Sequence, residues 1–199
     1  MSTKIRVVLP IALIGLLLLA ACGESTPTPE PTERPLMSFD FEEACRRGSI
    51  DRAPAYEPEA GSGKIHPMVL FKRDTADDSY LDLSPDSFEL PIPWMVDYGG
   101  DYGTVELVVC MTGIESTLAE DCAYEDDDSG EEYTLHVYET TYEVKVYAAH
   151  SGEELGTTTV KAEFETCPMF HMFSDKEEDS YVYPPVSPVQ EFLQQYVEP

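Results

Sequence analysis

Basic side chains are scarce in this sequence. Its 199 residues include 12 Lys and Arg against 39 Asp and Glu, which gives a formal net charge of −27. Nucleic-acid binding depends on clustered Lys and Arg that neutralise phosphates, and electrostatic adhesion to anionic lipid depends on the same charges. We therefore expect no nucleic-acid partner and no charge-driven contact with an anionic membrane surface.

Motifs that mark catalytic sites are also missing. The chain contains no G-x-S-x-G, no H-E-x-x-H, no phosphate-binding loop and no Ser/Lys signature. We therefore predict that the protein is not an enzyme. The alternative is a small envelope hydrolase that uses two acidic residues or His66, because only folding brings a pair of carboxylates together.

A hydrophobic run long enough to span a membrane is the third absence. The longest mainly apolar run, residues 7–21, has 15 residues and is interrupted by Pro10 and Gly15. A spanning helix needs about 20 apolar residues. Lys4 and Arg6 precede the run, and a positive region before a short apolar run is typical of an export signal. Residues 1–21 are therefore predicted to be a signal peptide.

The end of this run carries a recognisable motif. It reads Leu19-Ala20-Ala21-Cys22, which resembles the lipobox of bacterial lipoproteins. The resemblance implies cleavage before Cys22, a diacylglyceryl group on its sulfur and acylation of the new amine, for example with palmitate. Several acyl chains anchor a protein firmly, since each buried methylene contributes roughly 0.8 kcal/mol.

This motif predicts where the protein resides. We expect it in the bacterial cell envelope, anchored to a membrane by its N-terminal lipid, with the domain on the extracytoplasmic side. An uncleaved anchor and an ordinary secretory signal with an incidental cysteine are the alternatives.

A tether and one domain follow the signal. Residues 22–35 comprise the lipidated cysteine and a segment that contains four Pro and three acidic residues. Such a segment has nothing to bury and stays extended. At about 3.1 Å per residue in polyproline II, it reaches on the order of 40 Å. Residues 36–199 have the length of a single domain.

Four cysteines remain in this domain, at Cys45, Cys110, Cys122 and Cys167. An even number in an exported chain favours two disulfides. We prefer Cys110–Cys122, which would close a short excursion from a strand, with Cys45–Cys167, which would tie the N-terminal segment to a late strand end. Zinc is less favoured because close C-x2-4-C pairs are absent. A nucleophilic thiol would need a base and a reducing compartment.

Alternating apolar residues predict a mainly β domain. The candidate strands are residues 68–71, 105–111, 133–148 and 160–164. Both faces of 105–111 are apolar, so both are expected to be covered. In 133–148 the apolar positions change from odd to even near 139–141, which predicts a β-bulge or a bend. We expect an antiparallel sheet or sandwich.

Short helices are predicted at both ends of the domain. Residues 40–47 begin with Asp40 and Glu43 at the spacing of a capping box. A second helix begins at Pro188, with Ser187 as its N-cap. Its apolar side chains recur every three or four residues; they are Val189, Phe192, Leu193, Tyr196 and Val197. The predicted fold class is therefore mainly β, with a short N-terminal helix and a C-terminal amphipathic helix (α+β).

The order of motifs along the domain also resembles a known type. Ile65-His66-Pro67 precedes a strand, Cys110 ends a Val-rich strand, and Cys-Ala-Tyr at 122–124 and a late Cys-Pro follow. This order resembles an uncharacterised four-cysteine extracytoplasmic domain that recurs in bacterial lipoproteins and secreted proteins. The resemblance implies a shared fold and paired cysteines over residues 45–197, and it implies no activity.

One acidic segment is a candidate cation site. Residues 121–132 contain seven acidic residues, and Ca²⁺ takes six to eight oxygen ligands. Asp126 and Asp128 are the candidate ligands, although the EF-hand spacing is absent. A solvated, self-repelling loop is the favoured alternative, and no cofactor other than Ca²⁺ is expected.

Two further residues are candidate ligand contacts, His171 and Trp94. His171 lies in a Met-Phe-His-Met-Phe run, but no second histidine cluster supports a copper site. Trp94 could hold a sugar or a peptide, although core packing is favoured for the single Trp of the chain. The sequence thus predicts a lipid-anchored, non-catalytic binding module for an unknown protein or glycan partner. A Ca²⁺-dependent version of this module is an alternative.

Overall fold

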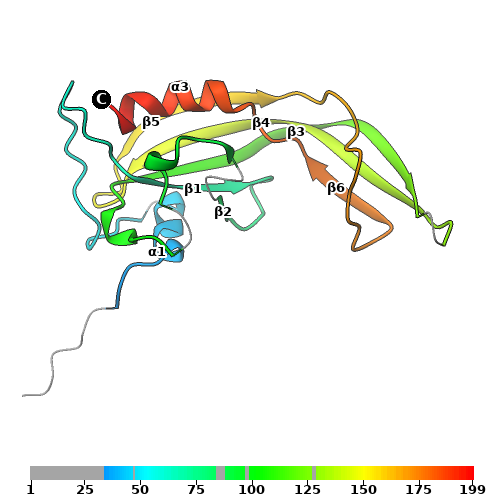
Figure 1. The fold of residues 1–199 in the computed structure, drawn as a ribbon, viewed down its shortest axis with the longest axis horizontal. Coiled ribbons are helices and arrows are strands. Elements are labelled where there is room, and N and C mark those ends of the chain that lie inside the picture. The colour runs from blue at the N-terminus through cyan, green and yellow to red at the C-terminus, as the bar shows by residue number, and fades with distance from the viewer. Residues whose placement is uncertain (1–33, 47, 84–87, 97–98, 127–128) are drawn as a thin grey trace, which may run out of the picture. The chain divides into compact units, whose positions relative to one another are not determined.

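A mixed β-sheet forms the centre of the domain in the computed structural model (Figure 1). The structure describes residues 34–46, 48–83, 88–96, 99–126 and 129–199. The predicted signal peptide, Cys22 and nearly all of the tether lie outside these residues. The strands are β1 Met68–Arg73, β2 Leu81–Leu83, β3 Leu107–Glu125, β4 Glu132–Ala148, β5 Glu154–Ala162 and β6 Glu177–Tyr181.

The strand order is β2-β1-β3-β4-β5, and β6 also pairs with β4. The mainly β fold class is confirmed, but the sheet is not purely antiparallel. β1 runs parallel to β3, and β6 runs parallel to β4. Parallel neighbours require a connection that carries the chain back along the sheet. Between β1 and β3 that connection is the irregular segment that contains β2 and the short helices η2 (Ile92–Trp94) and η3 (Tyr102–Thr104).

The first half of β3 is buried on both faces, as its sequence predicts. Leu107, Val109 and Met111 belong to a core on one face, and Val108 and Cys110 belong to a second core on the other. Helix α3 (Val186–Val197) covers the first face, and α1 (Ser38–Glu42) lies on the opposite side of the sheet (Figure 1). The sheet therefore forms the middle layer between the two terminal segments.

The C-terminal helix confirms the predicted apolar stripe. Val189, Leu193 and Val197 are fully buried against the sheet, and α3 packs along β5. The helix begins earlier than predicted, at Val186 with Pro185 in the N-cap position, so Ser187 is not the cap.

The N-terminal helix also differs from the prediction. Helix α1 begins at Ser38, and the 3-10 helix η1 (Glu43–Arg46) follows it. Asp40 is therefore not the N-cap: it is the third residue of the helix, and its carboxylate accepts a hydrogen bond from the Met37 N–H at 2.9 Å. That bond satisfies one of the unpaired backbone donors of the first turn.

The predicted irregularity in the long hairpin is present, but on the other strand. Burial along β4 changes from Leu135 and Val137 to Thr140 and Tyr142. The register shifts opposite this point lie in β3, between Gly113 and Glu115 and between Leu118 and Glu120. An extra residue in one strand bends the hairpin and increases its twist.

Beyond this bend the hairpin extends past the rest of the sheet. We call residues 113–139 and 163–181 the arm: the distal parts of β3 and β4, the segment that follows β5, and β6. A small core holds it together. Its members are Cys122, Leu135 and Val137, with Tyr124, Phe164, Cys167, Phe173 and Val182 packed against them.

A glycine stands where the arm begins. A Cβ on Gly113 would lie 1.8 Å from the carbonyl oxygen of Asp74, closer than any side chain tolerates. Pairing with β1 ends at Thr112, next to this contact. The chain that leaves β1 therefore lies close against β3 at the one residue type that permits such an approach.

Two disulfides cross-link the domain, which confirms that the four cysteines pair. The bonds are Cys45–Cys110 and Cys122–Cys167, with Cα–Cα distances of 5.6 and 5.8 Å. The preferred pairing of Cys110 with Cys122 and of Cys45 with Cys167 is therefore wrong.

Cys110 and Cys122 cannot pair because both lie on β3, and β3 is longer than predicted. Twelve residues of extended strand separate them by about 40 Å, whereas a disulfide needs Cα atoms within about 7 Å. The short excursion that was expected between them does not exist.

Candidate functional site

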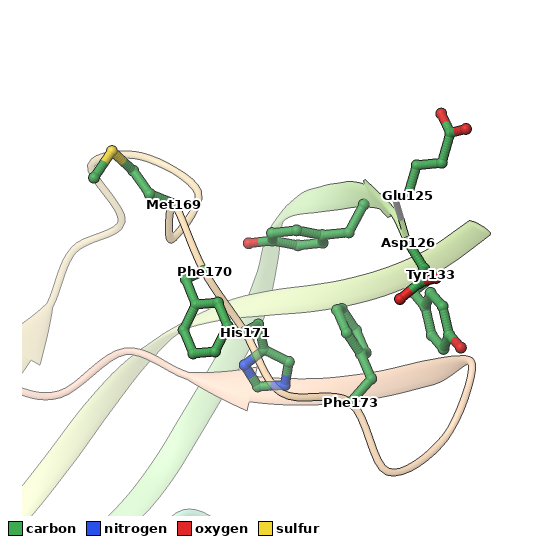
Figure 2. A pocket seen from close by; sticks show the side chains of 8 residues that line it. Glu125, Asp126, Tyr133, Met169, Phe170, His171 and Phe173 are labelled. Atoms are coloured by element: carbon green, nitrogen blue, oxygen red, sulfur yellow. The ribbon is translucent and has the colours of Figure 1, made fainter. Parts of the chain in front are cut away.

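A pocket of about 460 Å³ lies at the far end of the arm (Figure 2). One side comes from the ends of β3 and β4, and the other comes from the segment between β5 and β6. The residues that line it are Tyr124, Glu125, Asp126, Tyr133, Met169, Phe170, His171 and Phe173. Segments more than 30 residues apart in the sequence thus meet at one site.

Aromatic rings form the floor of this pocket. The Phe173 ring lies 5.3 Å from that of Tyr124, 5.0 Å from that of Tyr133 and 4.6 Å from that of His171, measured between centroids. Such separations are typical of favourable aromatic pairs. Phe173 is therefore the ring that joins the strand side of the pocket to the loop side.

Residues 168–173, which we call the rim loop, are held at several points. The Cys122–Cys167 disulfide ties the start of this loop to β3. The Tyr124 hydroxyl donates a hydrogen bond of 2.6 Å to the carbonyl oxygen of Pro168. At its other end, His171 Nε2 lies 2.9 Å from a carboxylate oxygen of Glu178 in β6. The rim loop is thus fixed by a disulfide and two hydrogen bonds.

This well-held loop exposes large apolar side chains. Relative to an extended chain, Met169 is 102% exposed, Phe170 75% and Met172 78%. Scattered exposed apolar residues are ordinary on protein surfaces, but a contiguous cluster marks an interaction site. Met and Phe are enriched at protein interfaces, and Met adapts its shape to varied surfaces.

A second cavity, with a volume of about 720 Å³, is lined in part by the residues that follow β5. Val137, Phe164, Pro168, Val182 and Tyr183 are among its apolar lining residues, with Lys161 and Glu163 at its edge. The rim loop therefore contributes Pro168 to this cavity and Met169, Phe170, His171 and Phe173 to the first one.

The arm is strongly acidic. Its two stretches contain 16 Asp and Glu, no Arg and a single Lys, Lys176. The pKa of Tyr133 is raised, chiefly because its hydroxyl donates a hydrogen bond to Glu131, with Asp126 contributing through its charge. The pKa of His136 is raised by its hydrogen bond to Asp121 and by the charges of nearby acids. In both cases the largest cause is the hydrogen bond to a single carboxylate, and the charges of nearby acids add to it.

The ionised carboxylate of Glu178 stabilises the rim loop and the turn that follows it. Its pKa is lowered from 4.5 to about 2 by the hydrogen bond to His171 and by the N–H groups of Asp175 and Ser174. A lowered pKa means that the folded protein favours the ionised carboxylate. The stabilisation is therefore present above pH 4.5 and is lost as the pH falls toward 2.

The substitution Glu178→Gln tests this contribution. We expect the variant to melt at a lower temperature than the wild type at pH 7, and the difference to shrink progressively between pH 4.5 and pH 2. The measurement is the thermal midpoint of both proteins across that range, with Glu165→Gln, an exposed acid of the arm, as the control. A difference that stays constant with pH would contradict the role of the ionised carboxylate.

His66, the candidate base of the hydrolase alternative, does meet a carboxylate. Its Nδ1 lies 2.5 Å from Glu106, whose other oxygen lies 2.8 Å from Lys64 Nζ. The imidazole is fully buried, with the Tyr56 ring packed against it at 4.8 Å. A substrate has no access to His66 in this arrangement, so the pair fits a role in packing between the start of β1 and the chain before β3.

The candidate calcium ligands are only partly described. Asp128 lies outside the described residues. Asp126 accepts hydrogen bonds from the backbone N–H and the hydroxyl of Ser129, at 2.7 and 2.8 Å, as in a tight turn. Among the described residues, no group of three or more His, Cys, Asp or Glu is placed to hold a metal ion.

Trp94 is a core residue, as favoured from the sequence. Only 2% of it is exposed, and its indole N–H donates a hydrogen bond of 2.8 Å to Glu198. It is therefore not a surface platform for a sugar or a peptide. His171 lines the pocket instead, and it contacts the Phe173 ring and is hydrogen-bonded to Glu178.

Comparison with known proteins assigns the chain to no family. No protein-family model matches it, and no curated protein or solved structure is detectably similar to it.

Sequence reasoning missed the pocket itself. Tyr124, Tyr133 and Phe173 were not singled out, because each belongs to an ordinary alternating or irregular stretch. The available signal is the run at 169–173, which has four large apolar side chains within five residues after Cys167-Pro168. Four such residues in a segment with no strand or helix period have no face to bury them on.

Proposed function

We propose that the protein is a lipid-anchored, extracytoplasmic binding module of the bacterial envelope that acts without catalysis. The observation that carries the proposal is the exposed Met169, Phe170 and Met172 on the disulfide-tethered rim loop. We take the partner to be a protein that covers this loop at the end of the arm.

The rim loop is already ordered before a partner binds, which favours binding. Binding a partner costs conformational entropy when a loop must be ordered first. The rim loop already has its disulfide, the Tyr124 hydrogen bond and the hydrogen bond between His171 and Glu178. Its apolar side chains can therefore be desolvated by a partner at little additional ordering cost, as is typical of the few side chains that dominate interface energetics.

The anchor completes the proposal. Cys22 would carry the lipid, and the Pro-rich tether would give the domain a reach on the order of 40 Å from the membrane. Within the described residues, no helix has the length and apolar character needed to cross a bilayer. An N-terminal lipid would provide attachment without such a helix.

Site-specific photocrosslinking in intact cells tests the binding surface. A photoreactive phenylalanine analogue replaces Phe170 in the full-length protein, and the control carries it at Ile92, which is 76% exposed and lies outside the arm. We expect one discrete crosslinked protein from position 170 and none from position 92. Cys22→Ser should abolish membrane fractionation, because the lipid is the proposed attachment to the membrane.

Quantitative binding then separates recognition from general stickiness. With the crosslinked protein purified, Met169→Ser combined with Phe170→Ser should raise its Kd at least tenfold, which corresponds to about 1.4 kcal/mol. Ile92→Ser should leave the Kd unchanged. Identical crosslinking from both positions, or equal Kd values for the two variants, would overturn the proposal.

A further inference from the structure

We propose that the aromatic pocket at the end of the arm receives a Lys or Arg side chain of the partner protein, which would lie against the Tyr133 and Phe173 rings. The inference rests on the proposed function and deepens it, because it names the chemistry that the partner presents. Three properties of the pocket support it: its rings, its charge and its position beside the rim loop.

The rings have the arrangement that suits a cation. Phe173 contacts both Tyr124 and Tyr133, at 5.3 and 5.0 Å between centroids, and the angles between ring planes are 63° and 32°. Rings that meet at such angles present π-faces in more than one direction. The face of an aromatic ring is negative and attracts ammonium and guanidinium groups within about 6 Å of its centre.

Two carboxylates, those of Asp126 and Glu131, lie near the Tyr133 ring. Asp126 lies beside Tyr133 in the pocket wall, while Glu125 points away from the rings toward solvent (Figure 2). Glu131 accepts the Tyr133 hydroxyl hydrogen bond at 3.2 Å. The nearby basic groups already have partners, since Lys176 pairs with Glu131 at 3.3 Å and His171 pairs with Glu178 at 2.9 Å. The balance of charge around the pocket is therefore negative.

The size of the pocket fits a long side chain. A cavity of about 460 Å³ that opens between strand residues and the rim loop has room for a four-carbon stem and its charged group. Lys and Arg bury their methylene stems against apolar surface while the charged end finds polar or aromatic partners. Here the stem would lie against Met169 and Phe170, and the charged end would reach the Tyr133 and Phe173 rings.

Charge favours a protein with a basic side chain over a second copy of this chain as the occupant of the pocket. A second copy of this chain would bring another −27 and another arm with a single Lys, so two such surfaces repel each other. A protein that presents a basic side chain within an apolar patch complements both the acidic pocket and the exposed rim loop. Electrostatic complementarity of this kind steers the encounter and excludes competing partners.

Binding of small probes to the full-length protein in detergent tests the pocket directly. The probes are N-acetyl-lysine methylamide, its uncharged norleucine counterpart and tetramethylammonium, observed through NMR shifts of ¹³C-labelled Tyr and Phe rings. We expect the lysine probe to shift the Tyr133 and Phe173 signals and to bind at least threefold more tightly than the norleucine probe. Raising the salt concentration from 0.05 to 0.5 M should reduce that preference.

Two substitutions of Tyr133 test the contributions of its ring face and of its hydroxyl group separately. Tyr133→Phe retains the π-face and loses only the bond to Glu131, so lysine binding should change less than twofold. Tyr133→Leu retains apolar volume and loses the π-face, so affinity for the lysine probe should fall three- to tenfold while affinity for norleucine stays the same. Asp126→Asn should weaken lysine binding, whereas Glu59→Gln, an exposed acid outside the arm, should not.

The outcomes distinguish this inference from the proposed function. Equal binding of lysine and norleucine, or equal loss in Tyr133→Phe and Tyr133→Leu, would overturn the cation inference even if crosslinking at position 170 succeeds. Much tighter binding of tetramethylammonium than of lysine would also overturn it, in favour of a free quaternary ammonium ligand. Failure of the crosslink would remove the proposed function, whatever the probes show.

Discussion

Replacing Cys45 and Cys110 together by alanine is expected to lower the free energy of unfolding by about 4 kcal/mol. The disulfide closes a loop of 65 residues, and the chain-entropy relation for a loop of that length predicts about this value. Cys110 is 3% exposed and lies in the core beneath α1. Alanine is chosen because serine would bury a hydroxyl without a partner.

Such a loss is large for a domain of this size, since typical stabilities are about 5–15 kcal/mol. Urea unfolding of the oxidised wild type and of the double variant measures it. The Cys122→Ala/Cys167→Ala variant is the matched comparison, since its loop of 45 residues predicts nearly the same entropic cost. A loss below 1 kcal/mol for Cys45→Ala/Cys110→Ala would show that this cross-link is not a main source of stability.

The two disulfides should differ in what they do to binding. Cys122–Cys167 anchors the rim loop, whereas Cys45–Cys110 joins η1 to the central strand β3. Under conditions where both variants remain folded, loss of the arm disulfide should weaken the partner and lysine-probe affinities. Loss of Cys45–Cys110 should leave them close to the wild-type values.

The second large effect is expected from Glu106→Leu, with a loss of about 3–5 kcal/mol. Glu106 is 7% exposed and receives both His66, at 2.5 Å, and Lys64, at 2.8 Å. His66 Nε2 already has no hydrogen-bond partner among the described residues. Removing the carboxylate would leave both nitrogens of a fully buried imidazole without a partner, and unpaired buried polar groups are costly.

A double-mutant cycle separates this loss from simple loss of packing. His66→Phe combined with Glu106→Leu replaces the buried pair by apolar groups of similar volume, which is often close to neutral. We therefore expect the double variant to be more stable than Glu106→Leu alone. Denaturant unfolding measures the cycle, with the exposed Glu115→Leu as a control expected to change stability by less than about 0.5 kcal/mol. If the double variant is no more stable than Glu106→Leu, the loss in Glu106→Leu does not come from leaving the buried His66 without a partner.

Much of the architecture follows from local pattern. The stripe Val189, Leu193 and Val197 recurs at the period of a helix, and these residues are buried where that period places them. The alternation of Val144 and Val146 likewise predicts the strand they occupy, because a half-buried strand must repeat every two residues. Both patterns involve residues that are close together in the sequence, so composition and spacing are enough to predict the helix and the strand.

The length of β3 did not follow from its pattern. Residues 114–118 are exposed on the arm and contain Glu115, Ser116 and Thr117 among their polar side chains. A strand without a buried face has no apolar alternation to mark it, so its distal half looks like a loop. That omission led directly to the wrong cysteine pairing.

The sequence by itself thus determined the mainly β class, the two terminal helices, the acidity of the arm and the presence of two disulfides among four cysteines. Only the tertiary structure decided which cysteines pair and which rings meet. Tyr124, Tyr133 and Phe173 come together because β3 and β4 pair in one register and the Cys122–Cys167 bond returns the chain to their end. Register and crossover depend on contacts between distant segments, and a short window of sequence contains no trace of such contacts.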